Sequence, residues 1–252
     1  MKKLRTNPKT AIFVGIASTV ILAVIFGVVL SIYFVAKSSV GTQLQWANGS
    51  KEYFDSAYQI AAADKDTPDK TLSIPNLADC FGQDQQKVLE ILGNEAYVVS
   101  SNTVNNNTEV VINFKNESAS EDSVAPICNA TFNKSGKLTK CSFTCNTSAL
   151  GYGALSFTDI INNAHVVENA LAEAGVSVAV GSVVVPADRS SYTTYESDGV
   201  TTVSEKYNFT GSAKANSRSC KWQALVNFDY SKANAKGNLA KTIRTIQITL
   251  ES

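Results

Sequence analysis

The longest hydrophobic pattern in the chain is a run of 26 residues, 11–36, that holds no charged side chain. The basic residues that flank it are Lys2, Lys3, Arg5, Lys9 and Lys37. A membrane-spanning helix needs about 20 apolar residues, whereas the apolar core of a cleavable signal peptide has about 7–15. The length therefore predicts a retained transmembrane helix over 11–36. Cleavage after Ala36-Lys37-Ser38, as in a signal peptide, is the alternative.

The flanking charges predict how the helix is oriented. Four basic residues precede the span and few follow it closely, and the positive-inside bias places such an N-terminus in the cytoplasm. We expect residues 1–10 to form a cytoplasmic stub and the chain beyond the span to be extracytoplasmic. The predicted location is thus the cell membrane, with a single pass that acts as a signal anchor.

A ladder of small side chains runs through this predicted helix at every fourth position. Its central members are Gly15, Thr19, Ala23 and Gly27. Small residues four apart form a groove that lets a second helix approach closely. The ladder predicts a helix–helix contact, either in a homodimer or with the transmembrane helix of a partner.

The part of the chain that follows the anchor reads as a tether and then a folded region. Residues 37–79 are predicted to be a tether that includes a short helix over 52–63 and a loop. Residues 80–148 show a helical pattern at 83–92, which Gly93 ends. Period-two alternation then predicts four strands. Their expected bounds are 97–101, 109–114, 127–132 and 138–145.

The same order recurs in residues 149–252. An amphipathic helix is predicted over 158–174, ended by Gly175. Four strands are expected to follow it, at 176–185, 200–209, 220–230 and 242–250. We therefore expect an α+β fold in which the extracytoplasmic domain consists of two tandem units, each a helix with its own four-stranded antiparallel sheet.

Local correspondences support this apparent tandem repeat. Gly93 matches Gly175, and the alternating triplet Cys141, Phe143, Cys145 matches Ile246, Ile248, Leu250. The layout resembles that of tandem-repeat periplasmic inhibitors such as the β-lactamase-inhibitor-protein-like domains, in architecture and without a shared motif. The resemblance implies a concave sheet that binds protein.

The distribution of charge narrows the partner classes. Residues 52–123 hold thirteen acidic side chains against four basic ones, and residues 211–252 hold seven basic side chains against two acidic ones. Residues 38–252 sum to about −5, which argues against a nucleic-acid partner. The remaining expected partners are the lipid bilayer, through 11–36, and an envelope protein or polymer.

Catalytic, cofactor and metal motifs are weak in this chain. His165 is the single histidine and lacks a neighbouring nucleophile motif, so a partly exposed helical histidine is expected rather than a general base. Asp64, Asp66 and Asp69 imitate the start of a calcium loop, but the positions for the required glycine and glutamate hold Asp69 and Pro75. No catalytic residue, cofactor or metal ligand is predicted.

The five cysteines carry the one testable constellation of side chains. Alternation aims Cys128, Cys141 and Cys145 at the core, and Cys80 precedes the first predicted helix. The hypothesis is a disulfide from Cys128 to either Cys141 or Cys145. Whichever of Cys141 and Cys145 remains is expected to pair with Cys80. Buried free thiols and a zinc site are the alternatives.

Taken together, these patterns predict a membrane-anchored cell-envelope protein whose exterior α+β domain binds a partner and is not an enzyme. The alternatives are an exterior hydrolase with a site assembled from scattered residues and a eukaryotic glycoprotein with a signal anchor. A polar pocket near His165 would favour the hydrolase. A sheet face with exposed aromatic side chains would favour the binding protein, with Tyr192, Tyr195 and Tyr207 as candidates.

Overall fold

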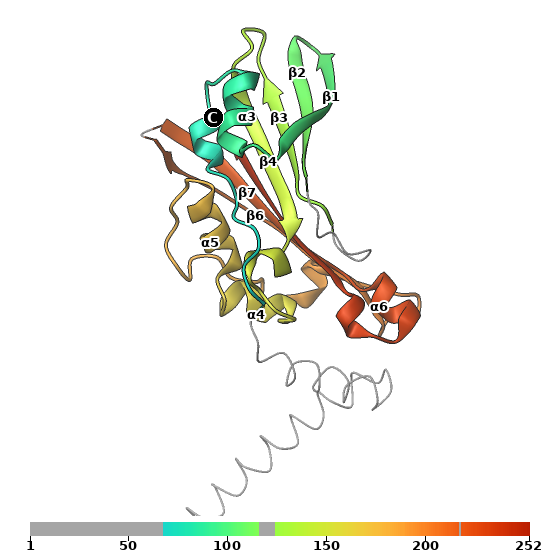
Figure 1. Cartoon of the computed structure of the whole chain (residues 1–252). Helices are drawn as coiled ribbons and strands as arrows, with labels where there is room; N and C mark the ends of the chain where they lie inside the picture. Colours follow the sequence, from blue (N-terminus) through green and yellow to red (C-terminus); the bar gives the residue numbers. More distant parts are fainter. Residues whose placement is uncertain (1–67, 116–123, 217) are drawn as a thin grey trace, which may run out of the picture. The chain divides into compact units, whose positions relative to one another are not determined.

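The computed structural model describes residues 68–115, 124–216 and 218–252. These residues form one eight-stranded antiparallel sheet with the strand order β1-β2-β3-β4-β8-β7-β6-β5 (Figure 1). The strands are β1 (Ala96–Val104), β2 (Asn107–Phe114), β3 (Ile127–Phe132), β4 (Leu138–Asn146), β5 (Thr193–Tyr195), β6 (Thr202–Ala215), β7 (Arg218–Asp229) and β8 (Ile243–Glu251). The helices are α3 (Gln85–Leu92), α4 (Phe157–Asn162), α5 (Val166–Glu173) and α6 (Ser231–Lys236), with short 3-10 turns η1 (Leu77–Cys80), η2 (Ser148–Leu150), η3 (Arg189–Ser191) and η4 (Leu239–Lys241).

The expected fold class, α+β with two tandem helix-plus-sheet units, is wrong. β4 pairs antiparallel with β8 from Lys140↔Glu251 to Asn146↔Thr245, and this pairing merges all eight strands into a single sheet. Each four-stranded group alone would leave the backbone groups of β4 or β8 without partners at an open edge. Joining them satisfies both edges, so the described chain is one mostly β body.

The triplets that suggested a repeat are cross-strand partners. Cys141 lies opposite Leu250, Phe143 opposite Ile248 and Cys145 opposite Ile246. All six side chains are buried at the centre of the core. Their similarity therefore reflects a shared location on one sheet face, because facing positions on neighbouring strands meet the same apolar environment.

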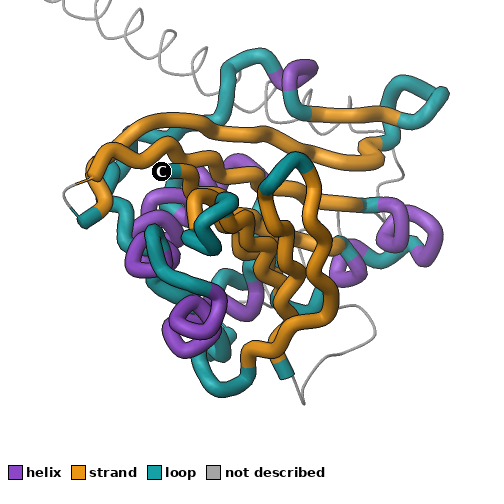
Figure 2. The backbone as a smooth tube through the Cα atoms, turned by 90° about the horizontal axis from the view of Figure 1, so that it is seen from above, coloured by secondary structure: helices purple, strands orange, loops and turns teal. Residues whose placement is uncertain are grey.

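One face of the sheet carries the core, and α3, α4 and α5 lie against it (Figures 1 and 2). Every second residue of the central strands is buried there, as in β7, where Trp222, Ala224, Val226 and Phe228 alternate with more exposed neighbours. This alternation is that of an antiparallel sheet with one face covered. The opposite side of the sheet is called the outer face below.

The segment 158–185 departs from its prediction in two ways. The expected helix 158–174 is two helices, α4 and α5, separated at His165, whose φ of +52° lies in the left-handed region. The expected strand 176–185 is a loop. Two side-chain acceptors hold this loop: Val185 N–H donates to Asn162 Oδ1 at 2.9 Å, and Val183 N–H donates to Glu168 Oε1 at 3.1 Å.

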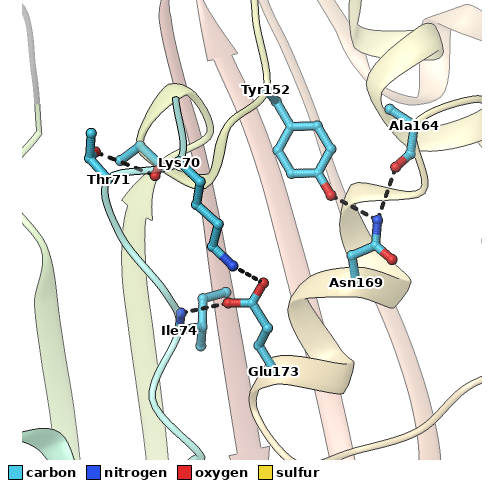
Figure 3. Close-up of polar contacts among 8 residues, drawn as sticks. Lys70, Thr71, Ile74, Tyr152, Ala164, Asn169 and Glu173 are labelled. Carbon is cyan, nitrogen blue, oxygen red and sulfur yellow. Dashed lines mark hydrogen bonds and ion pairs between the residues drawn. The ribbon is translucent and has the colours of Figure 1, made fainter. Parts of the chain in front are cut away.

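Residues 68–76 form an extended strap that crosses the helical layer before the first turn (Figure 3). Lys70 Nζ lies 2.7 Å from Glu173 Oε1 of α5, and Ile74 N–H donates to Glu173 Oε2 at 2.8 Å. The N–H groups of Thr71 and Leu72 both donate to the carbonyl of Ala149. The strap therefore fixes where the chain leaves the folded domain towards its N-terminus.

The predicted anchor cannot be compared with the structure. Residues 11–36, and with them Gly15, Thr19, Ala23 and Gly27, lie outside the described residues, as does the short helix predicted over 52–63. None of the helices in 68–252 that the structure describes is long and apolar enough to cross a membrane. The transmembrane helix thus stays a prediction from the sequence.

Candidate functional site

The outer face of the sheet is the most extensive feature that no described helix covers. Register places three cross-strand rows on it, each running over β2, β3, β4, β8, β7 and β6. The middle row is Val111, Asn129, Ser142, Thr249, Gln223 and Thr210; the row on one side is Asn113, Ile127, Thr144, Gln247, Leu225 and Asn208. These side chains are exposed or half-buried. Six strands at about 4.8 Å spacing extend over about 24 Å.

Hydroxyl and amide groups dominate these two rows. Asn and Gln side chains each offer two donor hydrogens and a carbonyl acceptor, and Ser and Thr hydroxyls can donate and accept. Because they project from paired strands, their backbone positions are already ordered before any ligand arrives. The few apolar members, Val111, Ile127 and Leu225, are half-buried.

Charged side chains gather in the third row, at one margin of this face. The row is Glu109, Thr131, Lys140, Glu251, Lys221 and Ser212. Glu251 lies in register with Lys140 on one side and Lys221 on the other, so opposite charges alternate across the strands. The two other rows are neutral, and the outer face as a whole has no single-sign field that would select a polyanion.

A shallow depression of about 270 Å³ opens between β6, β7 and β8, beside this margin. Its lining residues are Thr210, Gly211, Ser212, Lys221, Trp222, Gln223, Thr249 and Glu251. Six of these belong to the outer rows described above. The floor is formed where Gly211, which has no side chain, lies opposite Trp222. The depression combines hydroxyl, amide and charged groups around one concave spot.

A buried polar network lies on the other face, under η3. The carboxylate of Glu205, which is 7% exposed, accepts a hydrogen bond from Tyr230 OH at 2.6 Å and one from Arg189 Nη2 at 3.2 Å. Burial and the negative charge of Glu205 raise the pKa of Tyr230. Tyr230 therefore stays protonated and donates, so this network serves to tie η3 and β7 to β6.

His165 and Glu168 are neighbours, but the acid is already engaged. His165 Nδ1 is 3.9 Å from Glu168 Oε1, which is beyond hydrogen-bond length. The same oxygen accepts the N–H groups of Gly181 at 3.0 Å and Val183 at 3.1 Å. Glu168 is 2% exposed, whereas His165 caps the start of α5 rather than sitting within a helix. Glu168 thus holds the loop 176–187 in place.

All five cysteines are buried free thiols in the structure. Phe143 lies opposite Cys128, so Cys141 and Cys145 are each diagonal to Cys128, at about 7–8 Å. A disulfide requires Cα atoms within about 6.8 Å, so either bond would need the strands to shift. Cys80, in η1, donates its thiol to the Asn76 carbonyl at 3.8 Å. The disulfide hypothesis stays a prediction, and the described residues contain no cluster suited to a metal ion.

The remaining predicted residues do not meet in one place. Tyr192 stacks on Phe157 at 5.2 Å and Tyr207 packs against Phe209 at 4.9 Å, so both rings support the core, and Tyr195 is exposed on β5. Asp69 is exposed on the strap, whereas Asp64 and Asp66 lie outside the described residues. An exposed aromatic face, which would have favoured protein binding, is therefore not formed by these tyrosines.

The sequence pattern does not predict the three outer rows. It shows their residues only as the polar half of each alternating strand. Only the register shows that amides and hydroxyls from six strands align. No protein-family model, curated protein or solved structure matches the chain.

Proposed function

We propose that this chain is a single-pass, membrane-anchored cell-envelope protein whose exterior domain binds an envelope polymer rich in hydroxyl and amide groups and is not an enzyme. The predicted helix over 11–36 supplies the anchor and the residues beyond it supply the binding domain. The observation that carries the binding half of the proposal is the outer face, with its rows of amide and hydroxyl side chains.

The chemistry of this face favours a polymer over a protein. Protein interfaces draw most of their affinity from buried Trp, Tyr and Arg anchors. The two neutral rows contain none of these and instead present groups that each donate and accept, which match sugar hydroxyls. Ordered strand positions lower the entropic cost of holding such side chains in a complex. A repeating ligand also suits a face that extends over about 24 Å.

An exterior hydrolase has less support. Glu168, the acid beside the single histidine, is held by two backbone N–H groups. Tyr230, the other titratable group in a buried network, is kept protonated by burial and by Glu205. Glu168 and Tyr230 therefore make hydrogen bonds that stabilise the fold, and neither is left to act on a substrate.

Co-sedimentation tests the binding proposal. Full-length protein in lipid nanodiscs is mixed with isolated peptidoglycan sacculi, and the pelleted fraction is measured against sacculi concentration. Gln223→Ala with Gln247→Ala removes two amides of the outer face, and we expect at least about tenfold weaker binding, from about 1 kcal/mol for each lost hydrogen bond. The matched control is Gln85→Ala with Gln86→Ala on exposed α3. Absence of wild-type binding, or equal loss in the control, would overturn the proposal.

Protease accessibility tests the anchor and its orientation separately. A tag placed at the C-terminus should be removed when intact cells are treated with protease, whereas a tag at the N-terminus should persist until the cells are opened. The protein should remain in the membrane fraction after a carbonate wash. The reverse pattern of tag loss, or release by carbonate, would contradict the predicted topology without bearing on the outer face.

A further inference from the structure

The two edges of the sheet differ in how well they are protected. At one edge, β5 (Thr193–Tyr195) pairs only with the start of β6, up to Glu205, and the rest of that edge is β6 itself, which carries the exposed lysines Lys206 and Lys214. β1 closes the other with nine residues, Ala96–Val104, of which seven are exposed. Natural sheets protect edges with short strands, charged side chains, proline or a bulge, because an open edge is a template for another strand.

β1 carries only one of these protective features. It contains neither a charged residue nor a proline, and it exposes Tyr97, Val99 and Val104. A bulge interrupts its pairing with β2 between Val98 and Ser100. Beyond the bulge, Ser100–Val104 pairs with Val111–Asn107 in unbroken register, so this stretch remains a regular strand whose other side pairs with no strand within 68–115, 124–216 and 218–252.

We propose that β1 pairs antiparallel with β1 of a second copy of this chain, so that two sheets join into one. A two-fold contact places the same strand against itself, and any charge near the axis would meet its own copy. β1 is neutral throughout, so this self-pairing brings no like charges together. The exposed valines and tyrosine would gain cover from the same residues of the second strand.

The symmetry of this contact agrees with two chains that share one membrane. Antiparallel strands within one sheet are related by an axis perpendicular to the sheet, so each face of one copy continues into the same face of the other. The strap 68–76 lies on the helical side, bound to Glu173 of α5 and to Ala149. Both straps would therefore leave on one side, towards one bilayer, and the two outer faces would form a single longer one. This step rests on the proposed anchor.

Anchoring also favours self-pairing over pairing with a free peptide. Two chains confined to one membrane meet at a high effective concentration, so a modest edge contact is sufficient to hold them. A second contact between the predicted transmembrane helices would add to it.

Cysteine crosslinking in membranes tests the inference on the full chain. The five native thiols are buried, so single substitutions Ser101→Cys, Asn102→Cys and Thr103→Cys add the accessible thiol. We expect a disulfide-linked dimer after mild oxidation for at least one of them. Thr194→Cys, an exposed threonine on the opposite edge strand, is the matched control and should stay monomeric. Monomer in all four variants, or dimer in Thr194→Cys alone, would overturn the inference.

A charge substitution separates the edge contact from other sources of association. Asn102 lies opposite Glu109 of β2, so Asn102→Lys places opposite charges together within one chain while opposing self-pairing. Light scattering in nanodiscs or detergent should show at least tenfold weaker dimerisation for Asn102→Lys and no change for Thr194→Lys. A dimer that survives Asn102→Lys but is lost in Gly15→Ile with Gly27→Ile would place association in the membrane and overturn the edge contact, whatever the result of the sacculi experiment.

Discussion

The indole of Trp222 lies over Gly211, its directly opposed partner on β6. A Cβ placed on Gly211 would come within 2.6 Å of Trp222 Cε2, so only glycine leaves room for the ring. The pair closes the inner face below the depression in the outer face, and its packing therefore shapes the candidate site.

Gly211→Ala should destabilise the fold. The added methyl forces Trp222 out of its position, and overpacking of this kind costs about 1–3 kcal/mol. Urea unfolding followed by far-UV circular dichroism measures the loss, because Trp222, the tryptophan in the described domain, is itself replaced in one variant. In Gly211→Ala with Trp222→Leu the clash is relieved, so the double variant should lose less than the sum of the two single variants. Additive losses would mean that the ring does not press on position 211.

Glu168→Ala should release the loop 176–187. The buried carboxylate accepts the N–H groups of Gly181 and Val183, and a buried donor such as Val183 N–H that is left without a partner costs about 1–3 kcal/mol. Hydrogen exchange at these two amides should accelerate more than at Val88 in α3. Glu168→Gln keeps a carbonyl acceptor and should show less than half of the loss in stability. Equal losses in the two variants would indicate that the negative charge, and not the acceptor, holds the loop.

Tyr230→Phe should weaken the junction of β6 and β7. It removes the donor 2.6 Å from Glu205 Oε2 and leaves a buried carboxylate oxygen with one partner fewer. The expected cost is about 1.5–3 kcal/mol, the range for hydrogen bonds to charged groups. Tyr195→Phe, on the exposed edge strand, serves as the control and should change the free energy of unfolding by less than about 0.5 kcal/mol. A similar loss in both would contradict the network.

We expect the folded protein to lose stability at alkaline pH because its thiols are buried. Burial raises the pKa of Cys80, Cys128 and Cys145 from 9.0 to about 12. The unfolded chain releases these protons above about pH 9 while the folded chain keeps them to about pH 12. The stability that these protonated thiols contribute is therefore fully present below pH 9 and is lost as the pH rises towards 12. The free energy of unfolding falls by about 1.4 kcal/mol per pH unit for each thiol.

Urea midpoints between pH 8 and 10.5 measure this slope. Replacing all three cysteines by alanine should lower stability at pH 8, through cavities, and flatten the alkaline decline. Tyrosine ionisation contributes equally to both proteins as long as their cores are alike. An unchanged slope in the triple variant would mean that other groups cause the alkaline loss.

A thiol count distinguishes free cysteines from the disulfide hypothesis. With all five thiols free and buried, a thiol reagent should react slowly with the native protein and should label five groups in urea without reductant. Three labelled groups in urea, rising to five after reduction, would establish one disulfide.

Several elements were predictable from local patterns. The bounds expected for β3 match those observed, and those for β4, β7 and β8 differ by one or two residues. Each of these strands has one face in the core. Apolar and polar residues therefore alternate strictly along its sequence. α3 was predictable for a similar reason, because Asp84 caps its start and Gly93 its end.

Other elements depend on partners distant in sequence. The valine-rich stretch 176–185 has strand-like composition, but Glu168 and Asn162 satisfy its backbone in place of a neighbouring strand. His165 breaks an otherwise continuous helical pattern through a backbone conformation that periodicity does not reveal. The prediction of two units was wrong for the same reason. No local pattern in β4 or β8 indicates that these two strands pair with each other.

The sequence by itself determined the predicted anchor, the alternation of the central strands and the polarity of their outer positions, because each of these is a local periodic or compositional property. Only the tertiary structure decided that β4 joins β8, that amides and hydroxyls of six strands align in rows, and that β1 remains an open edge. These depend on register between distant segments. Register is set by how all the strands bury their apolar faces together, and a one-residue shift in it would move every side chain to the opposite face.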